Sequence, residues 1–160
     1  MATLKRNGHG QIELTRVSFT KDGNIEAQCF ATENMDNGAI VVVDKAAKEV
    51  SVATDFTKGL LGVNYTTEKH YNQFEPGRKH FQVKKGECPR VGYLKTGDVI
   101  TTNVMISEDG TEIADGAVED GLYWTAAGLV AEKPTAGLVL QVVEITDTAD
   151  GQDALKIQVL

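Results

Sequence analysis

Short apolar runs separated by turn residues cover most of the chain. Residues 11–19, QIELTRVSF, and 25–31, IEAQCFA, flank the dipeptide Asp22-Gly23. Two strand-like runs around such a dipeptide are a strong short-range hairpin signal. The continuous run 38–44, GAIVVVD, leads through KAAK into 49–54, EVSVAT, and predicts a second hairpin.

The rest of the chain repeats this pattern. Strands are predicted in 80–85, 88–94, 98–106, 137–146 and 154–160, and Asp-Gly turns fall at residues 109–110 and 150–151. No run of ten or more residues has helical periodicity with end caps, and short strands at this spacing are typical of barrels and sandwiches. The sequence therefore predicts an all-β fold, with a single β-barrel or sandwich-like domain over 11–160, long loops, and an extended N-terminal arm at 1–10.

Composition supports this fold and excludes several functions. The 160 residues include 16 glycines and 6% aromatics, and the net charge is -7. An acidic protein repels phosphate backbones, and no apolar run has the length of a membrane span, so neither nucleic acid nor membrane is expected as a partner. Cys29 and Cys88 are expected as free thiols in a reducing compartment, and the N-terminus lacks the apolar core of a secretory signal. We expect a cytoplasmic protein, unless it leaves the cell within a larger particle.

The strongest enzyme hypothesis is a thiol hydrolase that uses Cys88 with His80 as its base. Pro89 follows the cysteine directly, and no acyl-transfer signature surrounds it. We therefore favour Cys88 as a thiol buried on a strand, on the same face as Arg90. The three histidines lack paired ligand spacing, and the chain has no phosphate-binding glycine motif, so we expect no metal, no cofactor and no catalytic residue.

Two irregular stretches are candidates for partner contacts. The loop at 66–80 contains Tyr71, Phe74 and Arg78 among polar residues. The stretch 107–124 contains six acidic residues, which we expect to face solvent, and ends in Tyr123 and Trp124. Aromatic residues are enriched at interfaces, but a single tryptophan can equally close one end of a barrel. Both interpretations of this aromatic pair stay open.

The order of these segments resembles small head proteins of tailed bacteriophages. The resemblance rests on GQIELTRVSFTKDGNIEAQC, ENMDNGAIVVVD, VNYTTEKHYN, FQVKKGECPRVGYLKTGDVITTN, GLVLQVVE and LKIQVL. These are capsid decoration, or cement, proteins, which bind the outside of an assembled shell and stabilise it. The resemblance implies the major capsid protein as partner, self-association with a trimer as one candidate, and a location on the virion exterior after assembly in the host cytoplasm.

In that class the N-terminal arm often contributes to capsid binding. The matching segment of this chain supplies five capsid-contact candidates, Thr3, Leu4, Lys5, Arg6 and His9. Two other functions stay as alternatives, a tail- or fibre-associated β module and the cysteine hydrolase. We expect removal of residues 1–10 to leave the fold cooperative and to weaken particle binding. A charge at Val42 or Val142 should damage folding.

Overall fold

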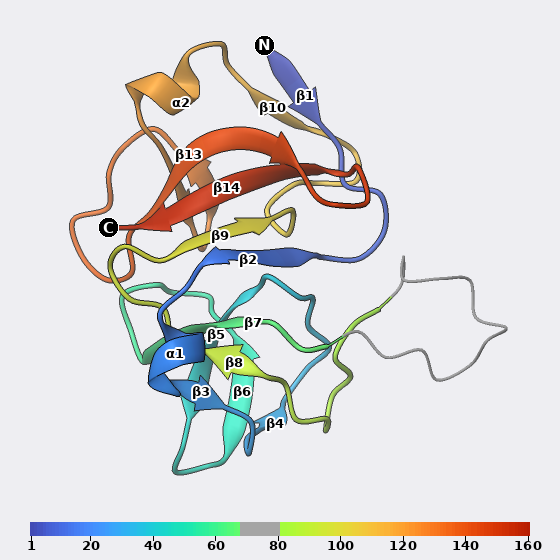
Figure 1. Ribbon diagram of the computed structural model, residues 1–160, viewed down its shortest axis with the longest axis vertical. Coiled ribbons are helices and arrows are strands. Elements are labelled where there is room, and N and C mark those ends of the chain that lie inside the picture. Colours follow the sequence, from blue (N-terminus) through green and yellow to red (C-terminus); the bar gives the residue numbers. More distant parts are fainter. Residues whose placement is uncertain (68–80) are drawn as a thin grey trace, which may run out of the picture.

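The computed structural model describes residues 1–67 and 81–160 (Figure 1). The chain is mostly β, with 40% of its residues in strands and 5% in helices, so the predicted all-β class is confirmed. The described strands form two six-stranded sheets and one two-stranded sheet. Figure 1 shows the two large sheets stacked along the long axis, with strand β2 (Ile12–Arg16) running between them.

The first sheet, which we call the terminal sheet, has the order β12-β11-β13-β14-β9-β2. Its neighbouring strands are all antiparallel. Besides β2, its strands are β9 (Val99–Thr102), β11 (Leu122–Thr125), β12 (Gly128–Val130), β13 (Leu140–Asp147) and β14 (Asp153–Val159).

The second sheet, which we call the nested sheet, has the order β3-β8-β7-β5-β6-β4. Only β4 and β6 run parallel in it. Its strands are β3 (Ile25–Glu26), β4 (Phe30–Ala31), β5 (Ile40–Asp44), β6 (Glu49–Val52), β7 (Leu60–Asn64) and β8 (Val91–Gly92). The whole nested sheet is built between two neighbouring strands of the terminal sheet, because the chain passes through it on the way from β2 to β9.

The predicted N-terminal arm is folded onto the domain. Strand β1 (Ala2–Leu4) pairs with β10 (Thr111–Ile113) in the two-stranded sheet. Leu4 is buried in the main core, and His9 is also buried. An apolar side chain that reaches the core holds this segment in place, so residues 1–10 are part of the fold rather than a free extension.

The main core lies between the two large sheets. The register aligns Val142, Ile157 and Ile100 across the terminal sheet, and all three are fully buried. Residues of the nested sheet and its connections, including Ile40, Val63 and Phe56, belong to the same apolar cluster. The next residue along each strand of the terminal sheet points away from this core, which explains the alternation seen in β14.

The nested sheet is covered on its other face as well. Val41, Val43 and Val50 pack there with Cys29, Ala31, Met35, Ala39, Val83 and Val91 in a second buried cluster. A strand buried on both faces needs no polar alternation. This explains why β5 is a continuous apolar run, in which only Val42 of the central valines is partly exposed.

Of the two hairpins predicted in the first third of the chain, the second is confirmed and the first is wrong. Strands β5 and β6 pair as a hairpin, and so do β13 and β14. Asp22-Gly23 does not join two paired strands, because Phe19–Asp22 forms the short helix α1 and Gly23 caps it in the left-handed conformation. Phe19 is fully buried, and β2 and β3 lie in different sheets.

Candidate functional site

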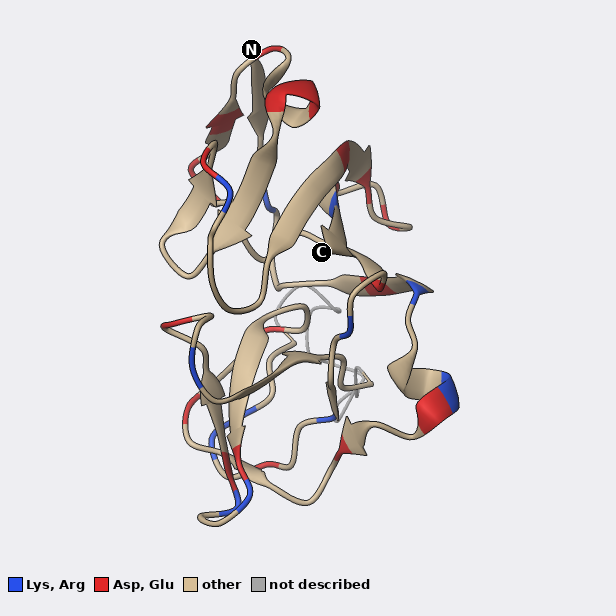
Figure 2. Ribbon diagram, turned by 90° about the vertical axis from the view of Figure 1, so that its left-hand side faces the viewer, with Lys and Arg blue, Asp and Glu red and all other residues tan. Residues whose placement is uncertain are grey.

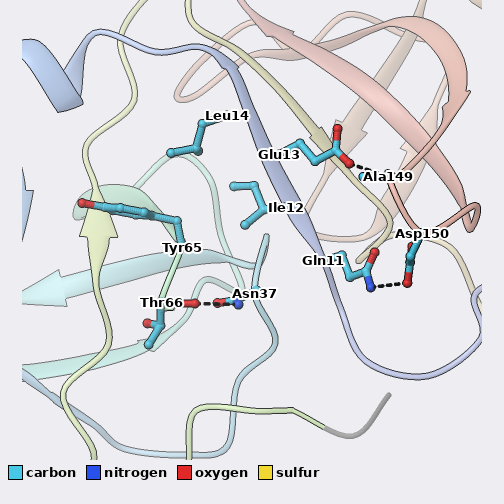
Figure 3. A pocket seen from close by; sticks show the side chains of 9 residues that line it. All are labelled: Gln11, Ile12, Glu13, Leu14, Asn37, Tyr65, Thr66, Ala149 and Asp150. Carbon is cyan, nitrogen blue, oxygen red and sulfur yellow. Dashed lines mark hydrogen bonds between the residues drawn. The ribbon is translucent and has the colours of Figure 1, made fainter. Parts of the chain in front are cut away.

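A cavity of about 420 Å³ lies where the edge of β2 meets the end of β7 (Figure 3). Strand β2 is the outermost strand of the terminal sheet, so one of its edges pairs with no other described strand. The lining residues come from segments that are distant in sequence: Gln11, Ile12, Glu13, Leu14, Asn37, Tyr65, Thr66, Ala149 and Asp150. We call this cavity the β2 cleft.

Polar groups on one side of the β2 cleft are held by local hydrogen bonds. Gln11 Nε2 donates to Asp150 Oδ2 over 2.7 Å, and the Ala149 amide donates to the Glu13 carboxylate (Figure 3). Partial burial raises the pKa of Asp150, but hydrogen bonds from Thr148, Gln152 and Gln11 outweigh it and lower the pKa to about 2. Asp150 is therefore an anionic hydrogen-bond acceptor rather than a proton donor at neutral pH.

On the opposite side of the cleft, two buried polar atoms have no hydrogen-bond partner among the described residues. Asn37 Nδ2 donates to the Thr66 carbonyl over 2.8 Å, but Asn37 Oδ1 accepts nothing from them. The Tyr65 hydroxyl is likewise unpartnered there, although its ring packs 5.1 Å from Phe19 and 5.4 Å from the Arg90 guanidinium. Buried polar groups are normally satisfied, so these two atoms are exceptions, but both are buried rather than open to the cleft.

The β2 cleft is lined by polar and aliphatic side chains. Its described lining has no histidine, cysteine or serine, and its two carboxylates, Glu13 and Asp150, already accept hydrogen bonds. The remaining lining is amide, phenol, hydroxyl and aliphatic, with Leu14 37% exposed. An unpaired strand edge beside such a surface suits an extended polypeptide, whose backbone can pair with the strand.

The five N-terminal candidates are not equivalent in the structure. Leu4 and His9 are buried, and the His9 ring lies 6.4 Å from that of Phe81. Arg6 forms a half-buried ion pair with Asp36, with Nη1 and Oδ2 3.0 Å apart. Of the five, only Thr3 and Lys5 are exposed and directly available to a partner.

The two aromatic candidates at the end of the acidic stretch differ in burial. Trp124 is buried in the main core, where its ring meets that of Phe56 edge-on at 5.8 Å. This arrangement matches the interpretation of Trp124 as a core residue, while Tyr123 is partly exposed on the other face of β11. Tyr71, Phe74 and Arg78 lie outside the described residues.

The prediction that Cys88 is buried on a strand is wrong. Cys88 is exposed and precedes β8, while Pro89 beside it is buried. Cys88 and Arg90 do share a face, but that face is the outer one. The buried thiol is Cys29, and its pKa is raised by burial and by the nearby Glu26 carboxylate. His80, the base of the hydrolase hypothesis, lies outside the described residues.

The acidic stretch lies on the surface, as predicted. Glu112, Asp115, Glu119 and Asp120 are all exposed, and Figure 2 shows acidic colour on the short helix α2 (Ala117–Asp120). Within residues 1–67 and 81–160, no three His, Cys, Asp or Glu side chains group as metal ligands would. None of the described helices is long and apolar enough to cross a membrane.

Sequence reasoning did not find the residues of the β2 cleft. Asn37 lies in an ordinary Asn-Gly dipeptide, and Asp150 in a segment typical of a hairpin tip. Their proximity depends on how the nested sheet packs against the terminal sheet, which no local pattern encodes. Comparisons with protein-family models, with curated proteins and with solved structures found no match for this chain. The chain is an all-β protein with an open cleft, whose described lining residues are polar and aliphatic.

Proposed function

We propose that the protein is a structural virion protein that binds the outer surface of an assembled phage capsid and stabilises it. The observation that supports this most is the β2 cleft, an open polar and aliphatic surface beside an edge of β2 that pairs with no other described strand. The resemblance to decoration proteins gives the partner class. On this proposal the protein is not an enzyme.

The contact we propose is an added strand. An extended segment of the major capsid protein pairs with the free edge of β2 and places an apolar side chain against Ile12 and Leu14. Main-chain pairing supplies affinity that depends little on the partner's sequence, and the aliphatic residues set the register.

Lys5 and Thr3 provide a second contact near the N-terminus. Both are exposed, in or directly after β1, and Lys5 is a cation on a protein whose net charge is -7. A self-associated form, with a trimer as the first candidate, would present several such surfaces at once. Several weak contacts on a symmetric shell then give strong retention.

The first test is cosedimentation of the purified protein with emptied heads of the phage that encodes it. We expect saturable binding, with one copy per one to six capsid subunits, and heads that resist heat better when occupied. Failure to bind, with intact heads, overturns the proposal. A count of a few copies per virion would instead favour the tail- or fibre-associated module.

A matched pair of variants tests the proposed contact. Leu14→Lys places a charge in the β2 cleft at a residue that is 37% exposed, while Leu60→Lys makes the same change on the nested sheet at 43% exposure. We expect Leu14→Lys to weaken head binding at least about tenfold and Leu60→Lys to leave it unchanged. Equal binding by both variants would remove the cleft from the interface.

Removing residues 1–10 does not separate an effect on binding from an effect on stability. The deletion takes Leu4 out of the main core and Arg6 away from Asp36, so it is expected to lower stability as well as binding. Lys5→Glu avoids this problem, because it changes only an exposed charge. We expect it to weaken head binding and to leave the melting temperature within about a degree of the wild type.

A further inference from the structure

The sequence contains two Asn-Gly dipeptides, Asn7-Gly8 and Asn37-Gly38. Asparagine before glycine is prone to spontaneous deamidation, because glycine has no side chain to hinder attack of its amide nitrogen on the asparagine carboxamide. The attack requires a carboxamide that can turn toward the next amide, and a next amide that no hydrogen bond holds. The two dipeptides differ in both respects.

Asn37 and Gly38 are held in place. Asn37 is 4% exposed, and its Nδ2 donates to the Thr66 carbonyl over 2.8 Å (Figure 3). The Gly38 amide donates to the Asn64 carbonyl, also over 2.8 Å. A Cβ atom added at Gly38 would lie 2.0 Å from Thr102 Oγ1, so the backbone is closely packed here. Ring closure at Asn37 would therefore break two hydrogen bonds in packed surroundings.

The reacting groups of Asn7 and Gly8 are not held in this way. Asn7 is exposed, and its carboxamide makes no hydrogen bond with the described residues. The Gly8 amide likewise donates to none of them. The backbone just before the dipeptide is fixed, because the amides of Arg6 and Asn7 donate to the Ser107 carbonyl and to Gln152 Oε1, each over 3.2 Å.

We propose that Asn7 is a site of spontaneous deamidation in the folded protein, and that the fold protects Asn37 from the same reaction. Water is the only co-reactant. The proposal does not rest on the proposed capsid function, because it depends only on the groups around the two dipeptides. Residue 7 is a modification site rather than a catalytic one.

The reaction has two steps. The Gly8 amide nitrogen loses its proton to solvent and attacks Asn7 Cγ, and the side-chain nitrogen leaves as ammonia, which produces a cyclic succinimide. Water then adds to one of the two ring carbonyl carbons and breaks the bond from that carbon to the Gly8 nitrogen. Opening at Cγ gives aspartate, and opening at the main-chain carbonyl gives isoaspartate. One water is consumed and one ammonia is released, with no change in oxidation state.

The isoaspartate product changes the backbone as well as the charge. Its main chain runs through Cβ and Cγ, which adds one main-chain atom between the Cα atom of residue 7 and the nitrogen of Gly8. His9 and Gly10 are buried beyond this point, and the amide of residue 7 is bonded to Gln152 before it. An added atom between two fixed points strains the segment, so we expect the isoaspartate form to melt at a lower temperature.

Peptide mass spectrometry of the full-length protein after ageing in mildly alkaline buffer tests the proposal. In the folded protein we expect Asn7 to become an acid at least about tenfold faster than Asn37, because reaction at Asn37 requires local opening of the structure. In concentrated urea, where neither dipeptide is held, the two rates should become similar. Equal rates in the folded protein overturn the proposal. An Asn7 that reacts in urea but stays an amide in the folded protein overturns it as well.

Two variants at the same position separate the added atom from the added charge. Asn7→Gln has a longer side chain that does not readily close the ring, so the aged variant should keep its amide and its melting temperature. Fresh Asn7→Asp carries the charge without the added atom and should melt as the wild type does. Aged wild type with isoaspartate at residue 7 should melt below both variants. An equal melting temperature for the isoaspartate form, or an equal loss in aged Asn7→Gln, would show that the added atom does not strain the segment.

Discussion

The close approach of Gly92 to Phe19 makes a stringent test of the packing between α1 and the nested sheet. A Cβ atom added at Gly92 would lie 2.5 Å from both Cε2 and Cζ of the Phe19 ring. Phe19 is fully buried, and its ring lies 5.1 Å from that of Tyr65, so it has little room to retreat. Gly92→Ala is therefore expected to strain the core.

The size of the effect follows from two opposing terms. Carbon atoms pack best about 3.5–4.0 Å apart, so the ring must shift by about 1 Å, and such overpacking costs about 1–3 kcal/mol. Gly92 is not among the glycines with positive φ, so alanine fits the backbone there. Alanine also restricts the unfolded chain more than glycine does, which stabilises the folded protein by about 0.4–1 kcal/mol. We expect a net loss of about 1–2 kcal/mol.

Urea unfolding followed by the fluorescence of Trp124, the single and buried tryptophan, measures this loss. Phe19→Leu removes the ring atoms that clash, so the double variant Phe19→Leu with Gly92→Ala should be more stable than the sum of the single effects by at least about 1 kcal/mol. As control, Gly151→Ala places alanine at φ +80° with no atom within 4 Å of its Cβ. Its effect should add to that of Phe19→Leu. Wild-type stability of Gly92→Ala, or additivity in the double variant, would refute a tight contact between Gly92 and the Phe19 ring.

Three further predictions concern folding and its pH dependence. Val142→Asp, at a fully buried position, should abolish cooperative unfolding in circular dichroism, while Val42→Asp, at a partly exposed position, should fold with reduced stability. Equal damage by the two variants would contradict the partial exposure of Val42. Asp36→Ala leaves the half-buried Arg6 guanidinium unpaired and should cost about 2–3 kcal/mol in urea unfolding, part of which Arg6→Met in the same chain should restore. Folding lowers the pKa of Asp150 from its ordinary 3.8 to about 2. The charged Asp150 carboxylate therefore contributes its full stabilisation above about pH 5, and this contribution is lost as the pH falls toward 2. Asp150→Asn should therefore flatten the decline of the urea midpoint over that range, and an unchanged decline would show that hydrogen bonds do not hold the carboxylate in its charged form.

Local patterns predicted the elements whose partners are near in sequence. The hairpins β5–β6 and β13–β14 follow from apolar runs on either side of short turns, and the turn before β9 follows from Gly97 and Asp98. The Asp98 carboxylate accepts the Lys95 amide over 2.9 Å, as expected for a polar side chain that stabilises its own turn.

Pairings between distant segments could not be predicted in the same way. An Asp-Gly dipeptide indicates a glycine with positive φ, and this conformation serves a helix cap as well as a hairpin, which is why Asp22-Gly23 does not form the predicted turn. The exposure of Cys88 depends on which face of its strand meets the second core. The β2 cleft requires Gln11, Asn37 and Asp150 to meet, and only the packing of the two large sheets brings them together.

The insertion of the nested sheet between β2 and β9 also constrains how the chain can fold during synthesis. All six strands of the nested sheet lie within residues 25–92, so they can pair before β9 has left the ribosome. Strands β1 and β2 emerge first but find their partners, β10 and β9, only after the nested sheet is complete. Strands β1 and β2 therefore remain unpaired during translation until β10 and β9 have emerged. The edge of β2 that lines the cleft is then exposed longest to neighbouring chains.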